Sequence, residues 1–484
     1  MGDFQQKYNL EIEEADNYLG PDGHIKEKVM LFNGPIISAN WGDTVNVTVV
    51  NRLRTNGYHS HFSTSYDVDL GPFLISDWYY GSADQMMSRI SSATEPFIAG
   101  QPGSPPESDN VLFNGTNVDP HGMRGGRYAH IHVTKGKRYR IRLINASVDN
   151  SFTISIVGHK MEVVHTDFVP VRPYHTDHLF LAVGQRYDVV IDAEADISNY
   201  WLNATFSETG LCGRSRNQNP AAILHYEDAP DPDHELPQEP GERPEDARCL
   251  DSLAYEPVLD RQVSRFPVGA PNVLTADMKI NRATNHNVIP VLMSSRESGN
   301  RGGGVHGLPS YRVEPSKASV SSKSLPVRIE EQEVSDTPWS YWLIQNFSPV
   351  PHPMHLHGHD FVVLGRSPAL PFPPATPVGF TGRPSMFNST VDREGLVWTN
   401  PMRRDTTVLP GLGWLVVAFE AGNPGSWIFH CHIAWHVSQG FSVQFLEEPE
   451  SIGAGMNLGE VAENCNAWRQ YAPQDDALKA DSGI

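Results

Sequence analysis

The sequence contains no run of 18 apolar residues and no long segment with helical periodicity. A membrane-spanning helix needs about 20 apolar residues, so we expect no transmembrane helix and no membrane partner. Positive charge is also scarce, because 37 Lys and Arg stand against 57 Asp and Glu and give a net charge of −20. An acidic surface repels phosphate backbones, so nucleic acid is excluded as a partner as well.

A secretory leader is another feature that the sequence lacks. The first six residues have neither the basic start nor the apolar core of a signal peptide. Asn-x-Ser/Thr sequons nevertheless favour a secreted glycoprotein, and they begin at Asn46, Asn114, Asn145, Asn203, Asn346 and Asn388. We therefore expect an extracellular protein whose leader has been removed, or a form that stays inside the cell.

Glycine and proline, by contrast, are plentiful, with 40 and 38 residues. Such frequent turn formers are typical of all-β proteins with many short strands. The length of 484 residues suggests roughly three domains. A stretch rich in Pro, Glu and Asp at 228–244 is typical of a linker between the second and the third.

One segment carries the strongest chemical signal, Gly425-Ser-Trp-Ile-Phe-His-Cys-His-Ile-Ala-Trp-His436. On an extended strand, His430 and His432 point to one face and Cys431 points to the other. A copper bound by Cys431 would therefore be connected through the backbone to metals bound by the two flanking histidines. His436 lies far enough along the chain to return to the copper of Cys431.

A second segment, His352-Pro-Met-His-Leu-His-Gly-His359, supplies the partners. His355 and His357 share one strand face, and we expect Pro353 to offset His352 so that it serves a different site. A thiolate with two imidazoles is the ligand set of a blue-copper electron-transfer centre. The remaining histidines predict a second copper site that is rich in imidazole.

These two segments resemble the third and fourth copper signatures of multicopper oxidases, specifically of ascomycete-type fungal laccases. The resemblance covers nearly the whole chain, from Glu14 to Ile484. It implies an all-β fold of three consecutive cupredoxin-like domains, each a Greek-key barrel or sandwich. It also implies copper as the cofactor and a monomer that acts on small phenols and dioxygen, as in lignin degradation.

The resemblance further implies a type 1 copper held by His352, Cys431 and His436. Phe441 stands ten residues after Cys431, where the family places the axial residue. Because phenylalanine cannot ligate, this copper should be three-coordinate and should have a raised reduction potential.

Internal repeats show where ligands are missing. Three segments of similar alternating pattern repeat one another: 41–51, 135–145 and 339–346. After the second and third copies, 152–159 aligns with 352–359. Phe152, Ser155 and Val157 then stand where the three histidine ligands stand, so the second domain is expected to be a copper-free copy. His359 matches His159 and is expected to be structural.

The first copy is followed after only eight residues by His59-Ser-His61, whereas the corresponding distance is 59 residues in the second copy and 84 in the third. The pair His59 and His61 resembles the family's second signature. The first signature, His-Trp-His-Gly, occurs nowhere in the chain. We therefore expect a truncated first domain at 1–66, a copper-free second domain at 67–250, and a third domain at 251–484 that carries type 1 copper.

By resemblance, six of the family's eight trinuclear histidines remain: His59, His61, His355, His357, His430 and His432. His355 would be the surviving type 2 ligand, and the other five would be type 3 ligands. The loss of two imidazoles predicts weak binding of type 2 copper and poor reduction of oxygen.

Further assignments rest on the resemblance alone. Asp167 aligns with the carboxylate that takes the phenolic proton near the type 1 histidine. Cys212 and Cys249 are expected to form a disulfide, whereas Cys465 lacks its partner in the first domain. The terminal Asp481–Ile484 resembles a plug that fills the oxygen channel above the trinuclear site.

Two functional interpretations stay open. The first is a laccase-like oxidase that couples one-electron oxidation of phenols to reduction of dioxygen to water, impaired by the missing ligands. The second is a copper-binding pseudoenzyme, or a splice or gene-model variant, that retains only type 1 copper. An in-frame His-Trp-His-Gly in the genomic DNA between the codons for Gly57 and Tyr58 would reveal the origin of the gap.

Overall fold

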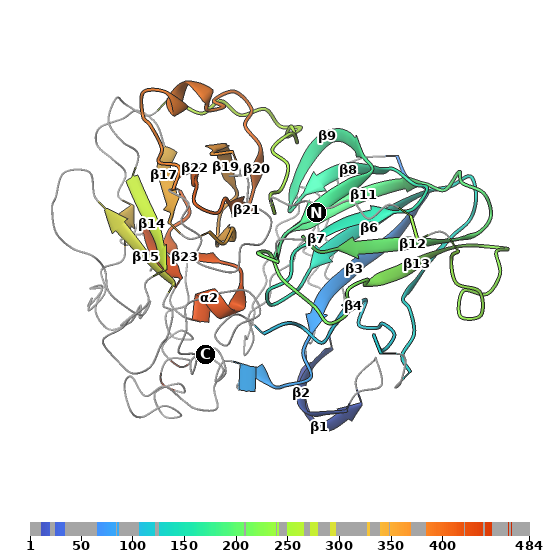
Figure 1. Ribbon diagram of the computed structural model, residues 1–484. Helices are drawn as coiled ribbons and strands as arrows, with labels where there is room; N and C mark the ends of the chain where they lie inside the picture. Colours follow the sequence, from blue (N-terminus) through green and yellow to red (C-terminus); the bar gives the residue numbers. More distant parts are fainter. Residues whose placement is uncertain are drawn as a thin grey trace.

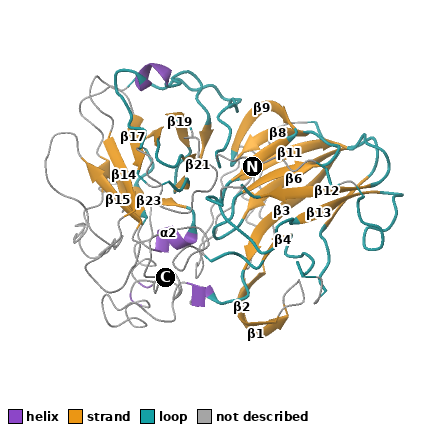
Figure 2. Ribbon diagram, viewed as in Figure 1, coloured by secondary structure: helices purple, strands orange, loops and turns teal. Residues whose placement is uncertain are grey.

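Two β-sandwiches lie side by side and make up most of the computed structural model (Figure 1). The structure describes residues 65–86, 106–265 and 339–447, except for 84, 122–124, 208–209, 239, 242–248, 348, 369–383, 421 and 439–440, together with five separate strands and positions 463 and 466. Strands dominate these residues (Figure 2), so the all-β prediction is confirmed. His59, His61, Cys465 and the segment ending at Ile484 lie outside the described residues.

The first sandwich packs a six-stranded sheet, of order β4-β3-β6-β11-β8-β9, against a five-stranded sheet, of order β10-β7-β12-β13-β5. The bounds of the six strands are β3 Val68–Trp78, β4 Asn110–Phe113, β6 Arg138–Asn145, β8 Met161–Thr166, β9 Val169–Thr176 and β11 Arg186–Asp192. Those of the other sheet are β5 His130–Val133, β7 Phe152–Ile156, β10 His178–Leu181, β12 Asn199–Thr205 and β13 Ala221–Tyr226.

The second sandwich has a six-stranded sheet of order β15-β14-β17-β22-β19-β20 and a five-stranded sheet of order β16-β24-β23-β18-β21. The bounds of the six strands are β14 Asn272–Met278, β15 Val291–Arg296, β17 Trp339–Asn346, β19 Phe361–Arg366, β20 Arg403–Arg404 and β22 Trp414–Glu420. Those of the other sheet are β16 Val327–Ile329, β18 His352–Leu356, β21 Thr406–Leu409, β23 Gly425–Cys431 and β24 Ser442–Glu447. A short 3-10 helix, η1 (Asp392–Gly395), and a one-turn helix, α2 (Ala434–Ser438), complete it.

The two sandwiches have the same strand order and the same two parallel pairs, β3 with β6 and β13 with β5 in one, β14 with β17 and β24 with β16 in the other. Equivalent asparagines close equivalent turns. The amide of Asn145 donates to the carbonyls of Asn150 and Leu181, and that of Asn346 donates to those of Val350 and Pro410. The repeat seen in the sequence is therefore a repeat of structure.

The same equivalence explains His359. Gly158 and Gly358 both have positive φ, of 73° and 74°, and each precedes a histidine whose Nδ1 lies beside the carbonyl two residues earlier. The Nε2 of His359 lies 2.9 Å from a carboxylate oxygen of Glu447. These contacts give His359 a structural role, as the alignment with His159 suggests.

Before residue 65 the structure describes one antiparallel hairpin, in which β1 (Glu11–Leu19) pairs with β2 (Ile25–Asn33). In the described part of the chain no helix is both long enough and apolar enough to cross a membrane.

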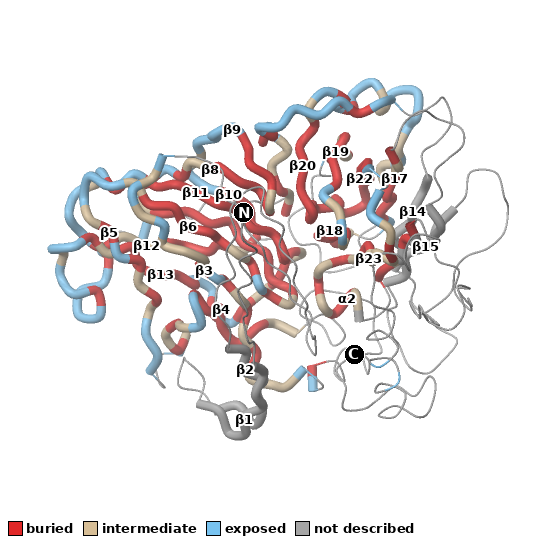
Figure 3. The backbone as a smooth tube through the Cα atoms, turned by 180° about the vertical axis from the view of Figure 1, so that it is seen from behind, coloured by how far each residue is buried: buried red, intermediate tan, exposed pale blue. Residues whose placement is uncertain are grey.

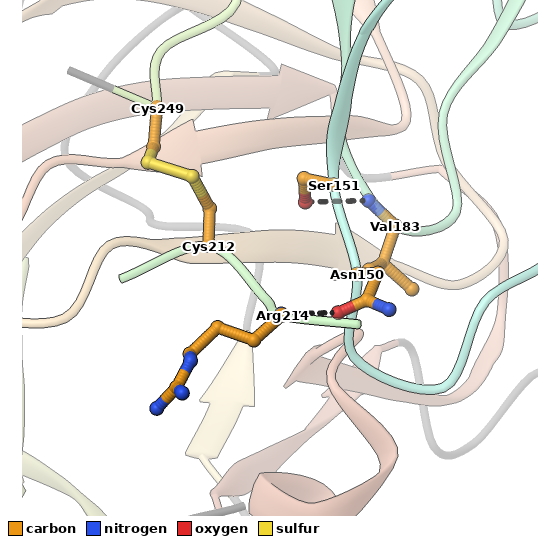
Figure 4. The surroundings of a disulfide bond; sticks show 6 residues. All are labelled: Asn150, Ser151, Val183, Cys212, Arg214 and Cys249. Atoms are coloured by element: carbon orange, nitrogen blue, oxygen red, sulfur yellow. Dashed lines mark hydrogen bonds between the residues drawn. A yellow bond between two sulfur atoms is a disulfide. The ribbon is translucent and has the colours of Figure 1, made fainter. Parts of the chain in front are cut away.

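The expected disulfide between Cys212 and Cys249 is present (Figure 4), so that prediction is confirmed. Both half-cystines are buried and pack with Phe180 and Ala182 of the first sandwich against Val408 of the second. The disulfide thus lies at the contact between the two sandwiches, whose interiors are lined by buried strands (Figure 3).

Burial corrects part of the glycosylation prediction. Asn145, Asn203 and Asn346 are at most 1% exposed, and each side-chain amide donates to backbone carbonyls. These sequons cannot carry a glycan in the folded chain, since the asparagine is part of the core. Asn114 and Asn388 are exposed, whereas Asn46 lies outside the described residues.

Candidate copper site

The candidate site is built on one antiparallel strand pair, β18 and β23. Met354 lies opposite Cys431, and His355 lies opposite His430. Because side chains alternate along a strand, Cys431 projects from one face of the pair and the two histidines project from the other. His352 begins β18 two residues before Met354, so regular alternation alone directs it to the face of Cys431, and the offset expected from Pro353 is not needed.

On the first face three ligand atoms converge. The Sγ of Cys431 lies 3.7 Å from Nδ1 of His352 and 3.5 Å from Nδ1 of His436, which α2 brings back to the strand. All three residues are buried. The ring of Phe441 packs edge-on against His352 with centroids 4.7 Å apart, and it is fully buried. The position expected for an axial residue is therefore filled by an apolar wall.

Burial keeps these groups uncharged. It lowers the pKa of His436 to about 4, and burial together with His436 lowers the pKa of His352 well below its ordinary value. Burial raises the pKa of the Cys431 thiol. Neutral imidazoles are ready to bind a metal, and a buried thiol gives up its proton when a metal replaces it.

The opposite face carries an imidazole cluster. One ligand atom each from His355, His357 and His430 lies within 4.8 Å of the other two, and the Nε2 atoms of His357 and His430 are 3.0 Å apart. The ring of His432 lies 5.6 Å from those of both His355 and His430. Burial, followed by the neighbouring His355, lowers the pKa of His432 to about 3.

Backbone carbonyls fix the tautomers of two of these histidines. Nδ1 of His355 lies 2.8 Å from the carbonyl oxygen of Asp405, and Nδ1 of His430 lies 2.8 Å from that of Cys431. A carbonyl only accepts, so each Nδ1 carries the proton and each Nε2 keeps its lone pair for a metal.

Both donor sets suit copper. Two imidazoles and a thiolate form the trigonal set of a blue-copper site, and an array of neutral imidazoles suits copper of either valence. The described residues therefore fit two kinds of copper site on opposite faces of one strand pair.

Asp167 is buried and hydrogen-bonded to Arg404 of the second sandwich. Its side chain is 1% exposed and accepts from Nε and Nη2 of Arg404, at 2.9 and 3.2 Å, and from the backbone of Arg186, Asp405 and Thr406. A carboxylate held in this way joins the two sandwiches. The sequence could not show this, because Arg404 is 237 positions away.

Two other carboxylates lie near the type 1 ligands and were not found from the sequence. The loop that follows β6 accepts a hydrogen bond from α2, because the N–H of Ala434 donates to the carbonyl of Val148. In that loop Asp149 is 9% exposed, and burial raises its pKa to about 7, an effect to which the neighbouring Asp77 adds. Asp77 accepts from three backbone N–H groups, those of residues 148–150.

A cavity of about 650 Å³ lies between the sandwiches and is lined by Arg172, Asp260, Val363 and Met402 among others. None of its lining residues is one of the candidate copper ligands. This cavity is therefore not part of the candidate copper site.

Comparison with known proteins identifies the class. One model of the multicopper oxidase family matches residues 69–229, and a second matches residues 311–451. The chain therefore belongs to the multicopper oxidase family, and copper is its cofactor.

Its relatives within that family are laccases. A laccase of Cryphonectria parasitica is 39% identical over 557 aligned positions, which cover 99% of this chain and 89% of the relative. Laccase-1 of Melanocarpus albomyces is 40% identical, with 99% of this chain and 84% of the relative covered. The crystal structure of a laccase from Botrytis aclada superposes with a TM-score of 0.66 at 28% identity, covering 87% of this chain and 71% of that one. The chain is thus a laccase-like oxidoreductase with cupredoxin domains.

Proposed function

We propose that this chain oxidises small phenols at a type 1 copper and reduces dioxygen at a separate, imidazole-rich copper cluster. The type 1 ligands would be His352, Cys431 and His436. The cluster ligands would be His59, His61, His355, His357, His430 and His432. The observation that carries the proposal is the pairing of β18 with β23, which supports two donor sets on opposite faces of one strand pair.

Copper in these donor sets accepts single electrons, and four of them, with four protons, convert one dioxygen to two waters. Four phenols each supply one electron and one proton. The residues of the chain provide the path for these electrons and the surroundings of the copper ligands. Cys431 is bonded through the backbone to both His430 and His432, which provides a covalent path between the two sites. Phe441 forms a buried apolar wall against His352, and burial favours the neutral imidazoles of His352 and His436.

A second function, electron transfer at type 1 copper without reduction of oxygen, is favoured by two observations. The His-Trp-His-Gly signature is missing from the sequence. The alignment with the Cryphonectria parasitica laccase also spans more positions than this chain has residues, so parts of that relative have no counterpart here. Type 2 copper would then keep a single imidazole, that of His355.

The test is to load the chain with copper and to measure copper per chain, visible absorption and oxygen uptake with a simple phenol. We expect a blue protein with less than the family's full complement of copper and slow oxygen uptake. A blue protein that takes up no oxygen would favour the second function. A copper-loaded protein without a visible band would overturn both.

We further propose that the chain is a secreted monomer with three domains, at 1–66, 67–250 and 251–484. The exposed sequons at Asn114 and Asn388 support secretion. Glycan analysis of the secreted protein and its mass in solution would test these points.

A further inference from the structure

A turn of the first sandwich contacts the proposed copper cluster of the second sandwich at His432. The turn comprises residues 182–186, joins β10 to β11, and is buried throughout. We propose that this turn positions His432 and His355 for copper, because Gly184 leaves room for the imidazole of His432 and Arg186 holds Asp405, which orients the imidazole of His355. The inference rests on the assignment of these histidines to the copper cluster made above.

Gly184 lies directly against His432. A Cβ added at Gly184 would lie 2.3 Å from Cδ2 and 2.5 Å from Nε2 of the imidazole, closer than atoms can approach. The residue also has a φ of +82°, which favours glycine. Any side chain here would have to displace the ring of His432. The absence of a side chain at Gly184 therefore sets where that ring can lie.

Arg186 acts through Asp405. Its Nη1 and Nη2 donate to the two carboxylate oxygens of Asp405 at 2.7 and 2.6 Å. Both side chains are buried, and Nη1 also donates to the carbonyl of Gly184 at 2.9 Å. A bidentate pair of this kind fixes the orientation of both partners as well as their distance. Arg186 thus ties the turn to the segment between β20 and β21.

Asp405 in turn holds His355. Its carbonyl oxygen accepts from Nδ1 of His355 at 2.8 Å, and one of its carboxylate oxygens accepts from the Thr406 hydroxyl, which lies 3.0 Å from the same Nδ1. The imidazole of His355 is therefore oriented by a residue whose own position depends on Arg186. Groups that orient a metal ligand in this way often affect metal affinity about 10–100-fold.

The turn is itself held rigidly. The N–H of Gly184 donates to the carbonyl of Asn145 at 3.0 Å, and that of Val183 donates to the hydroxyl of Ser151 at 3.3 Å, beside the disulfide (Figure 4). The amide of Gln185 donates to Asp251 at 2.8 Å and to the carbonyl of Thr406 at 3.0 Å. A sandwich without copper ligands among its described residues therefore forms a fixed support for ligands in its neighbour.

The first test uses the copper-free full chain, so that it does not depend on copper loading. Histidine is labelled with ¹⁵N, and the imidazole signals are assigned by single substitutions. Gly184→Ala should shift the His432 signal, and Arg186→Lys should shift the His355 signal and speed exchange of its Nδ1 proton. Gly136→Ala is the matched control, because its φ of +85° imposes the same strain while its Cβ would meet nothing within 4 Å. Arg138→Lys is the control for the arginine, because Arg138 also forms ion pairs, with Glu162 and Asp192, but its side chain is 32% exposed.

The second test titrates Cu²⁺ into the same proteins and follows the visible type 1 band separately from total copper. Gly184→Ala and Arg186→Lys should keep the band and bind the remaining copper about 10–100-fold more weakly than the controls. If the parent chain binds type 1 copper only, the proposal of a second copper cluster is refuted. The imidazole signals alone then test whether the turn positions His432 and His355. If the Gly184→Ala protein does not fold, the Arg186→Lys protein alone tests the inference. Unchanged His432 and His355 signals in the two variants would overturn the inference.

Discussion

Replacing Asp149 by asparagine should remove a loss of stability that the parent protein shows as pH rises from about 4 to about 7. The folded chain holds this carboxyl in a buried position next to Asp77, which raises its pKa from the ordinary 3.8 to about 7. The unfolded chain exposes it with its ordinary pKa. Between about pH 4 and about pH 7 the folded state therefore binds the extra proton, and stability falls as pH rises through this window.

The size of the effect follows from the two pKa values. A difference of one pKa unit corresponds to about 1.4 kcal/mol, so charging Asp149 in the folded protein costs about 4 kcal/mol above pH 7. Little of this is lost to solvent screening, because the side chain is 9% exposed. Below about pH 4 the carboxyl is neutral in both states, and the cost disappears. Asparagine has a similar shape and does not titrate.

The assay is the thermal midpoint of parent and Asp149→Asn protein at several pH values from 4 to 8. The variant should gain roughly 4 °C over the parent near pH 7.5 and little near pH 4. Asp196→Asn, at a fully exposed carboxylate, is the control and should show no such trend. A gain that is the same at every pH, or that grows toward acid pH, would refute the reasoning.

Three further predictions concern single side chains. Cys431→Ser should abolish the blue colour of the copper-loaded chain completely, since serine cannot provide the thiolate, and a visible spectrum decides it. Phe441→Met should lower the reduction potential of type 1 copper by supplying an axial thioether, as measured by redox titration, and a potential equal to or above that of the parent would count against an axial position for Phe441. Arg404→Met should destabilise the protein by about 3–5 kcal/mol, because Asp167 and Asp251 lose a buried cationic partner, and a thermal midpoint unchanged from the parent would contradict the interface described here.

The sequence predicts the strand pair that carries the proposed copper ligands, because these residues lie close together along the chain. The alternation of His430, Cys431 and His432 is a local property, and the extended backbone converts it directly into two faces. The structural equivalence of the two sandwiches is also anticipated by the repeats, since Asn145 and Asn346 end equivalent strands and make equivalent hydrogen bonds.

The surroundings of the ligands could not be predicted in the same way. Asp167 and Asp149 are both aspartates in polar segments, and only folding shows that one is paired with Arg404 whereas the other is buried beside Asp77. The contact of Gly184 with His432 and the ion pair of Arg186 with Asp405 arise across two sandwiches. Such contacts depend on how domains pack, which no local pattern encodes.

The burial of Asn145, Asn203 and Asn346 has a consequence for how the chain must be made. On the secretory route, sugar can be transferred to a sequon while the polypeptide is still being extended, before any strand has paired. A glycan on one of these asparagines would occupy the place of a core hydrogen-bonding group. Each molecule that reaches the folded state must therefore have escaped modification at all three positions. The yield of correctly folded protein then depends on a race between strand pairing and glycosyl transfer.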